Sequence, residues 1–215
     1  MTQLSAENHF STPIYSVLDE SFLKNIKRIS KKSLKKVKKE KGMNENFPVI
    51  MSENFFADPD AHDFTDFVGR SSWQILKDQG YAMDNMVVQF TEMWTQQHHK
   101  HSLMEQHSHR FGSQIVGFYF LEVPKEAPRA LFYDPRVSRL HGSLPESDPT
   151  RLSSASSVIN YEPKPGLFIF TNSWLAHSFT KNITEEPFSF VHFNLTVAPV
   201  PQATTAPSVP EVEVV

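Results

Sequence analysis

The chain changes its periodicity at Gly80. Beyond this residue, apolar and polar side chains alternate along eight short segments, the pattern of β-strands with one face against a core. Turn signals such as Asp134-Pro135-Arg136 and Pro163-Lys164-Pro165-Gly166 separate the segments. The predicted strands cover residues 86–94, 105–110, 114–122, 130–134, 157–161, 167–171, 175–180 and 188–197. So many short strands in ~110 residues predict a mainly β fold, a sandwich or barrel of the jelly-roll type.

Helices are predicted before Gly80. From Ser21 to Lys41, apolar residues recur at helical spacing among lysines, which predicts a basic amphipathic helix that ends near Gly42. A second helix is predicted after Asp58-Pro59, because aspartate caps a helix and proline suits its first turn. Residues 47–51 between them have the pattern of a short strand. We expect both helices to flank the β domain.

Charge divides the chain into three parts. Ten of the 21 lysines and arginines lie between residues 24 and 41, whereas the remainder is acidic. We therefore predict a basic N-terminal arm over residues 1–46, one β domain over 47–198 and a disordered, proline-rich tail over 199–215. The arm has two interpretations: it contacts nucleic acid or another anionic surface, or it is a solubilising helix whose apolar stripe packs on the domain.

Composition restricts the compartment and the chemistry. The chain has no cysteine, which excludes disulfides and thiolate-bound metal sites and fits a reducing compartment. The N-terminus lacks the apolar core of a signal peptide, and no run approaches the ~20 apolar residues of a membrane span. We expect a cytoplasmic protein.

Two histidines that are separated by one residue are the chief chemical signal. His107 and His109 lie on a predicted strand, where residues two apart share a face at about 7 Å. His177 lies on a distant predicted strand and is placed to complete a site. Such a triad holds iron(II) on one side and leaves positions open for other ligands. A second group, in a polar segment without alternation, is predicted to form a solvated loop: His98, His99 and His101.

The order of several motifs resembles a known family, the iron(II)/2-oxoglutarate-dependent oxygenases. More closely, it resembles a prolyl-hydroxylase-like subgroup that occurs in bacteria and in phages, cyanophages among them. The resemblance runs from about Trp94 to Val197. It is carried by His107-Ser108-His109, Gly112-Ser113, Gly117-Phe118-Tyr119-Phe120-Leu121, Phe132-Tyr133-Asp134-Pro135-Arg136, Pro165-Gly166-Leu167, Ser173-Trp174-Leu175-Ala176-His177 and His192-Phe193-Asn194.

The resemblance implies a fold, a set of cofactors and a reaction. The fold is a double-stranded β-helix, in agreement with the strands counted above. The metal is iron(II), and the co-substrates are 2-oxoglutarate and dioxygen. The reaction oxidises 2-oxoglutarate to succinate and carbon dioxide and hydroxylates a protein prolyl or other side chain. A phage-encoded member would act in the host cytoplasm.

The sequence departs from this family at two positions. The family's second metal ligand is usually Asp or Glu, whereas this chain has His109, which either binds the metal directly or lies behind a ligand such as water. The arginine that anchors 2-oxoglutarate in the family is replaced by Phe188, which cannot pair with a carboxylate.

The last predicted strand suggests a replacement for the anchor. His192 and Asn194 share a face with Phe188, so a protonated His192 is our candidate, with Tyr119 as a second donor and Asn194 beside it. Lys181 and Arg129 are alternatives. We therefore predict that the metal is held by His107, His109 and His177, and the co-substrate by Tyr119, His192 and Asn194.

Two other functions remain open at the level of the sequence. The missing arginine favours a non-catalytic metal-binding jelly roll, such as a virion or adaptor component. The basic arm favours a hydroxylase that acts on nucleic acid. Residues 137–156, which are rich in serine and proline, are the candidate substrate-facing loop.

Overall fold

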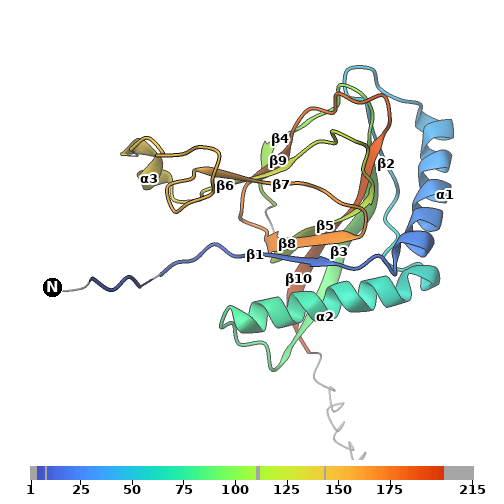
Figure 1. Ribbon diagram of the computed structural model, residues 1–215. Coiled ribbons are helices and arrows are strands. Elements are labelled where there is room, and N and C mark those ends of the chain that lie inside the picture. The colour runs from blue at the N-terminus through green and yellow to red at the C-terminus, as the bar shows by residue number, and fades with distance from the viewer. Residues whose placement is uncertain (1–3, 8, 110–111, 143, 201–215) are drawn as a thin grey trace, which may run out of the picture.

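The structure, a computed structural model, describes residues 4–7, 9–109, 112–142 and 144–200. Its strands form two antiparallel sheets (Figure 1). The six-stranded sheet has the order β1-β8-β5-β10-β3-β2, with bounds Ile14–Leu18, Leu167–Asn172, Ile115–Glu122, Phe188–Pro199, Met86–His98 and Val49–Met51. The four-stranded sheet has the order β4-β9-β6-β7, with bounds Met104–His107, His177–Phe179, Ala130–Tyr133 and Val158–Tyr161. The mainly β, double-stranded β-helix fold is confirmed.

The space between the two sheets is filled mainly by aromatic side chains. Alternation along β5 and β10 points every second residue inward, where these side chains meet residues of β6 and β9. The buried members of this inner core are Val116, Phe118, Phe120, Ala130, Phe132, Ile169, Leu175, Phe179, Phe188 and Phe190. The interior is therefore packed toward one end and leaves room for polar groups toward the other.

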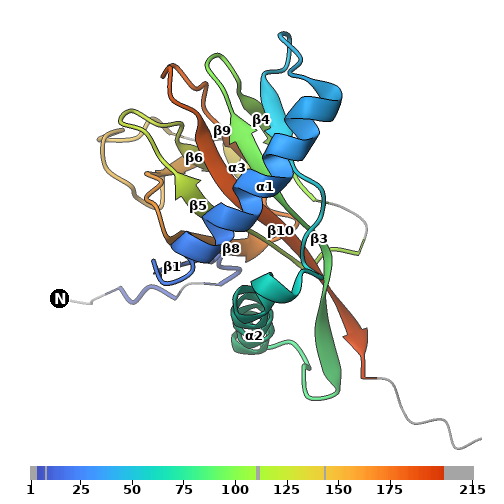
Figure 2. The ribbon, with the colours of Figure 1, turned by 90° about the vertical axis from the view of Figure 1, so that its right-hand side faces the viewer.

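Helices cover the other face of the six-stranded sheet (Figure 2). Helix α1 spans Leu23–Lys41 and helix α2 spans His62–Asp78, preceded by the 3-10 turn η1 over Pro59–Ala61. Asp58 caps that turn by accepting a hydrogen bond from the Asp60 amide, as the Asp-Pro signal predicts. The two helices and the outward residues of the sheet share a second apolar core.

The N-terminal segment is bound more closely to the β domain than its charge suggests. The sequence showed no strand before residue 20, yet β1 pairs along its whole length with β8. Helix α1 buries Ile26 and Ile29 in the outer core, which confirms the apolar stripe of the packed-helix interpretation. The division at residue 46 thus separates elements that share a core, although α1 is basic as predicted.

Three element boundaries differ from the predicted ones. Strand β3 continues to His98, so this histidine is buried inside the sheet and its predicted place in a solvated loop is wrong. A short helix, α3 (Val137–His141), occurs within the predicted irregular loop. Strand β10 extends to Pro199, and the predicted disorder over residues 201–215 lies outside the described residues.

Of the described helices, none is long and apolar enough to cross a membrane.

Candidate metal centre

The four-stranded sheet brings the three predicted histidines together. His107 ends β4 and is paired directly with His177, the first residue of β9. His109 follows β4, and its backbone amide donates to the Ser173 carbonyl at 2.9 Å, which holds it beside the start of β9. Each histidine offers one ring nitrogen, and these three atoms all lie within 4.8 Å of one another. The predicted triad is therefore assembled, and one metal ion could be shared by three imidazoles.

Hydrogen bonds to the backbone orient two of the rings. Nδ1 of His107 donates to the Glu105 carbonyl at 2.8 Å, and Nδ1 of His177 donates to the Leu175 carbonyl at 3.0 Å. A proton on Nδ1 leaves the Nε2 lone pair free for a metal, a common arrangement at protein metal sites. Nε2 of His177 and Nε2 of His109 are buried without a hydrogen-bond partner among the described residues. Buried nitrogens in this state fit a metal ion.

The rings of His109 and His177 are neutral near pH 7. Burial, aided by the neighbouring His107, lowers the pKa of His109 to about 4 and that of His177 to about 3. A metal binds neutral imidazole, so these two rings are available to a cation near pH 7.

A fourth histidine, His192, lies behind the triad. Its ring centroid is 4.9 Å from that of His109 and 4.7 Å from that of Trp94, and both of its nitrogens are buried without a partner among the described residues. Burial and the three neighbouring histidines lower its pKa well below the usual value. The protonated His192 that the sequence-based hypothesis required is therefore disfavoured, and the ring is neutral.

The other two predicted co-substrate residues have different positions. Asn194 lies on the inner face, where its amide donates to Glu92 at 2.6 Å. Tyr119 lies on the outer face among the helices, and its hydroxyl donates to the Asp19 carbonyl at 2.9 Å. The strand alternation explains this, because Phe118 points inward and its neighbour must point outward. Tyr119 is thus not brought to the histidines, and its predicted role is wrong.

The position of the family's arginine is enclosed by aromatic rings. Phe188 has no exposed surface and contacts Phe120, Phe179 and Phe190, with ring centroids 5.5–5.9 Å away. The two alternative cations lie at the surface. Lys181 is exposed, and Arg129 is paired with Glu162 at 3.2 Å.

A cavity of about 680 Å³, the metal-side cavity, opens onto His107 and His109. His107, His109 and His192 form one wall, and Trp94 and Gln96 of β3 form another. Neither Trp94 nor Gln96 was among the predicted site residues. Their signal was present in the sequence, because they alternate with Met93 and Thr95 on the strand that pairs with His192.

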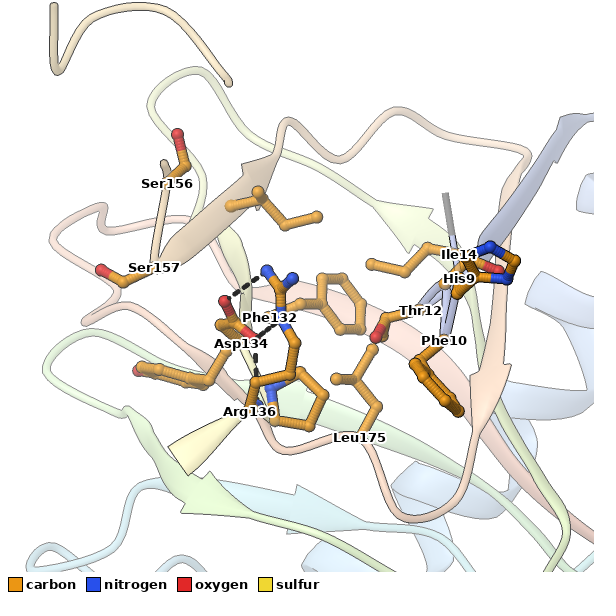
Figure 3. Close-up of a pocket in the computed structure, with 14 residues that line it drawn as sticks. His9, Phe10, Thr12, Ile14, Phe132, Asp134, Arg136, Ser156, Ser157 and Leu175 are labelled. Carbon is orange, nitrogen blue, oxygen red and sulfur yellow. Dashed lines mark hydrogen bonds and ion pairs between the residues drawn. The ribbon is translucent and has the colours of Figure 1, made fainter. Parts of the chain in front are cut away.

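A second cavity, of about 330 Å³, is lined by Leu175, which precedes His177 by two residues (Figure 3). Phe132, Leu175 and Ile14 form its apolar floor, and the segment that contains His9 and Thr12 lies opposite Arg136. Asp134 is held at its rim by hydrogen bonds from the Arg136 and Arg139 guanidinium groups. These hydrogen bonds keep the pKa of the Asp134 carboxyl far below its ordinary value, although its burial acts in the opposite direction.

Comparison with known proteins connects this arrangement to a class of enzymes. A family model described as "Putative 2OG-Fe(II) oxygenase" matches residues 92–194, just under half of the chain and including all three histidines. No curated protein matches the sequence. Among solved structures, AviO1 from Streptomyces viridochromogenes Tue57 is similar with a TM-score of 0.59 at 12% identity, covering 88% of this chain and 93% of that chain.

Two prolyl hydroxylases share the fold as well. The prolyl-4-hydroxylase of Pseudomonas putida has a TM-score of 0.57 at 8% identity, covering 86% of this chain and 93% of that chain. The viral collagen prolyl hydroxylase of Paramecium Bursaria Chlorella virus-1 has a TM-score of 0.52 at 10% identity, covering 85% and 94%. At these identities the likeness concerns the fold.

The family match, the fold and the triad together define the class of the protein. It is an enzyme, an iron(II)- and 2-oxoglutarate-dependent oxygenase. Iron(II) is its metal, and 2-oxoglutarate and dioxygen are its co-substrates. The non-catalytic alternative is therefore not supported.

Proposed function

We propose that this oxygenase binds iron(II) through His107, His109 and His177 and hydroxylates a side chain of a protein or peptide. The observation that carries the metal assignment is the set of three ring nitrogens within 4.8 Å of one another, of which those of His109 and His177 have no other partner among the described residues. Three neutral imidazoles bring no negative charge. The metal together with its three protein ligands would therefore have a net charge one unit more positive than with a His-Asp-His set.

The residues around the triad have defined roles in this proposal. Iron(II), once bound, supplies the activation of dioxygen that accompanies oxidation of 2-oxoglutarate. The backbone carbonyls of Glu105 and Leu175 keep the His107 and His177 rings in the ligand orientation. His192 and Asn194 line the inner face behind the metal and are the proposed neighbours of the co-substrate. Phe118 and Phe132 contact the His177 ring and exclude water from that side.

The second cavity supports a peptide substrate. Its floor of Phe132, Leu175 and Ile14 suits an apolar side chain, and its rim offers Thr12 and Arg136 to a peptide backbone (Figure 3). Ser156 of the predicted substrate loop lines it, and so does Leu175, whose backbone carbonyl accepts the hydrogen bond from His177. The prolyl hydroxylases that share the fold make a prolyl residue our first candidate, as expected for the prolyl-hydroxylase-like subgroup of bacteria and phages.

The test combines metal binding with turnover of the co-substrate. Iron content and succinate production from 2-oxoglutarate are measured for the wild type and for His107→Ala, His109→Asp and His177→Ala. We expect both quantities to fall sharply in the two alanine variants and to persist in His109→Asp, which restores the family's usual ligand. His62→Ala, which removes an exposed histidine on α2, is the matched control. Full iron retention in both alanine variants at the triad would contradict the assignment.

A nucleic-acid substrate is the second candidate, supported by the surface of α1. Four of its basic residues pair with acids of the domain, namely Lys27, Arg28, Lys31 and Lys36. The other six are exposed and make no ion pair with any described residue: Lys24, Lys32, Lys35, Lys38, Lys39 and Lys41. Contacts to phosphates would give binding that weakens steeply with salt, so titration of an oligonucleotide at two salt concentrations tests this candidate.

The lack of cysteine supports the proposal that the enzyme works in a reducing compartment, the cytoplasm or, for a phage-encoded protein, the host cytoplasm.

A further inference from the structure

The co-substrate requires a partner that the expected position does not offer. 2-Oxoglutarate binds a metal through its keto acid end, and its second carboxylate lies two methylene groups further away. An inward-pointing cation is absent from β10, where Phe188 lies in the aromatic cluster. No lysine or arginine is among the described residues that line the metal-side cavity. Among the described residues, a carboxylate in this cavity would therefore have no lysine or arginine partner.

Polar groups do occur beside the lost arginine, on the neighbouring strand. In the β3–β10 pair, Phe188 lies opposite His98 and Phe190 lies opposite Gln96. Residues opposite each other in an antiparallel pair project to the same face, so Gln96 and His98 point into the barrel. Both are almost fully buried, at 3% and 1% exposure. Two polar side chains in an aromatic interior are costly unless they have partners.

His98 orients the amide of Gln96. The ring nitrogen Nε2 of His98 lies 3.1 Å from Oε1 of Gln96 and donates to it. The amide nitrogen of Gln96 then has its two N–H groups free, because it makes no hydrogen bond to any described residue. The Gln96 side chain lines the metal-side cavity, whereas His98 does not. The pair thus presents a donor to the cavity from a fixed position.

Trp94 and His192 lie between this donor and the metal centre along the cavity lining. Trp94 lies two residues before Gln96 on the same face, opposite His192, which in turn contacts His109. The indole N–H of Trp94 is buried without a partner among the described residues. Gln96 is therefore one step further from the triad than Trp94, as the second carboxylate of a metal-bound 2-oxoglutarate would be.

We propose that Gln96, positioned by His98, binds the distal carboxylate of 2-oxoglutarate with neutral N–H donors, and that Trp94 supplies a second donor. This inference rests on the proposed function and moves the anchor from β10 to β3. His98 is a positioning residue, since it acts through the amide of Gln96. The neutral ring fits this role, because burial lowers the pKa of His98 to about 4.

The experiment compares two ligands that differ only at the far end. Calorimetric titration of the manganese(II)-loaded protein measures Kd for 2-oxoglutarate and for 2-oxopentanoate, which has a methyl group in place of the distal carboxylate. Gln96→Leu removes the donors, and Gln96→Glu keeps an acceptor for His98 but repels a carboxylate. We expect both variants to bind 2-oxoglutarate roughly 10- to 100-fold more weakly and 2-oxopentanoate unchanged.

Two further variants sharpen the result. Gln97→Leu, at the next position on the opposite face of β3, is the matched control and should bind both ligands like the wild type. His98→Leu should weaken 2-oxoglutarate binding, but little further in combination with Gln96→Leu, because both changes remove one interaction. If the Gln96 variants bound both ligands equally weakly, or bound 2-oxoglutarate as tightly as the wild type does, only the assignment of Gln96 to the distal carboxylate would be overturned. If the metal-loaded wild type binds neither ligand, the proposed function is overturned with it.

Discussion

His107 and His177 lie opposite each other across β4 and β9, with ring centroids 4.5 Å apart. The two residues are 70 positions apart in the sequence, so the pair exists only when the four-stranded sheet has formed. A metal held by both residues therefore links two strands and must bind the folded state more tightly than the unfolded chain.

This linkage predicts a gain in thermal stability from metal. A ligand at about 100 times its Kd stabilises the folded state by ~2.7 kcal/mol, which corresponds to roughly 5–10 °C in Tm for a chain of this size. Addition of manganese(II) or iron(II) under anaerobic conditions should raise Tm by this amount, and a chelator should reverse the gain. His177→Ala should show no shift. An equal shift in this variant would place the stabilising metal elsewhere.

The burial of His98 predicts a dependence of stability on pH. The folded-state pKa of about 4 lies below the usual 6.5, so below pH 6.5 the unfolded chain takes up a proton that the folded chain does not. The contribution of the neutral His98 ring to the free energy of unfolding is fully present above pH 6.5. It is lost as pH falls toward 4, and the total loss is up to roughly 3 kcal/mol. Urea unfolding at pH 7 and 4.5 should show a smaller loss in His98→Asn than in the wild type. Identical losses would contradict the neutral, buried ring.

The aromatic cluster predicts that the family's arginine cannot simply be restored. An arginine at this position could anchor the co-substrate only if the site had room for its guanidinium group. Phe188 has no exposed surface and lies among Phe120, Phe179 and Phe190, so a guanidinium there would be buried without a partner. We expect Phe188→Arg to lower the free energy of unfolding by roughly 3–5 kcal/mol. Phe188→Leu, the apolar control, should cost less than about 2 kcal/mol. A stable Phe188→Arg protein would show that the cluster can open.

The sheet permits no side chain at Gly117. A Cβ atom at this position would lie 2.2 Å from the Phe193 ring and 2.6 Å from the Ile169 carbonyl oxygen. Gly117→Ala should therefore destabilise the protein by about 1–3 kcal/mol. Gly69→Ala is the control: it lies in α2 with no atom near a new Cβ and should be neutral or stabilising by up to about 1 kcal/mol. Chemical denaturation of both variants would reveal the contrast, and similar changes would refute it.

The packing of α1 predicts that the basic segment contributes to stability. Ile26 has no exposed surface and belongs to the outer core. Ile26→Ala should cost about 2–5 kcal/mol, whereas Lys35→Ala, on the exposed side of the same helix, should change the free energy of unfolding by less than about 0.5 kcal/mol. If Ile26→Ala also had no effect, α1 would be a separate arm, as its charge alone suggested.

The sequence predicted those features that depend on local pattern. Alternation located the strands that carry His107 and His177, and the His-x-His spacing identified the triad before any contact was known. Strand β1 was missed because its residues show no alternation and its place depends on pairing with β8, more than 140 residues away.

The errors at the site have a similar origin. Tyr119 was assigned to the co-substrate although the alternation that points Phe118 inward turns Tyr119 outward. His98 was placed in a loop because its segment is polar, whereas pairing with β10 extends β3 through it. Alternation along β3 marks Gln96 as inward-pointing, but its proposed role could not be read from that pattern, since it depends on the pairing of β3 with the strand that carries Phe188.

The most direct test of the account is a crystal structure of the protein with manganese(II) and 2-oxoglutarate. We predict one metal ion bound by ring nitrogens of His107, His109 and His177, the keto acid of 2-oxoglutarate on the same ion, and the distal carboxylate within hydrogen-bonding distance of the Gln96 amide. A metal bound without these three histidines, or 2-oxoglutarate bound away from the metal, would contradict the account.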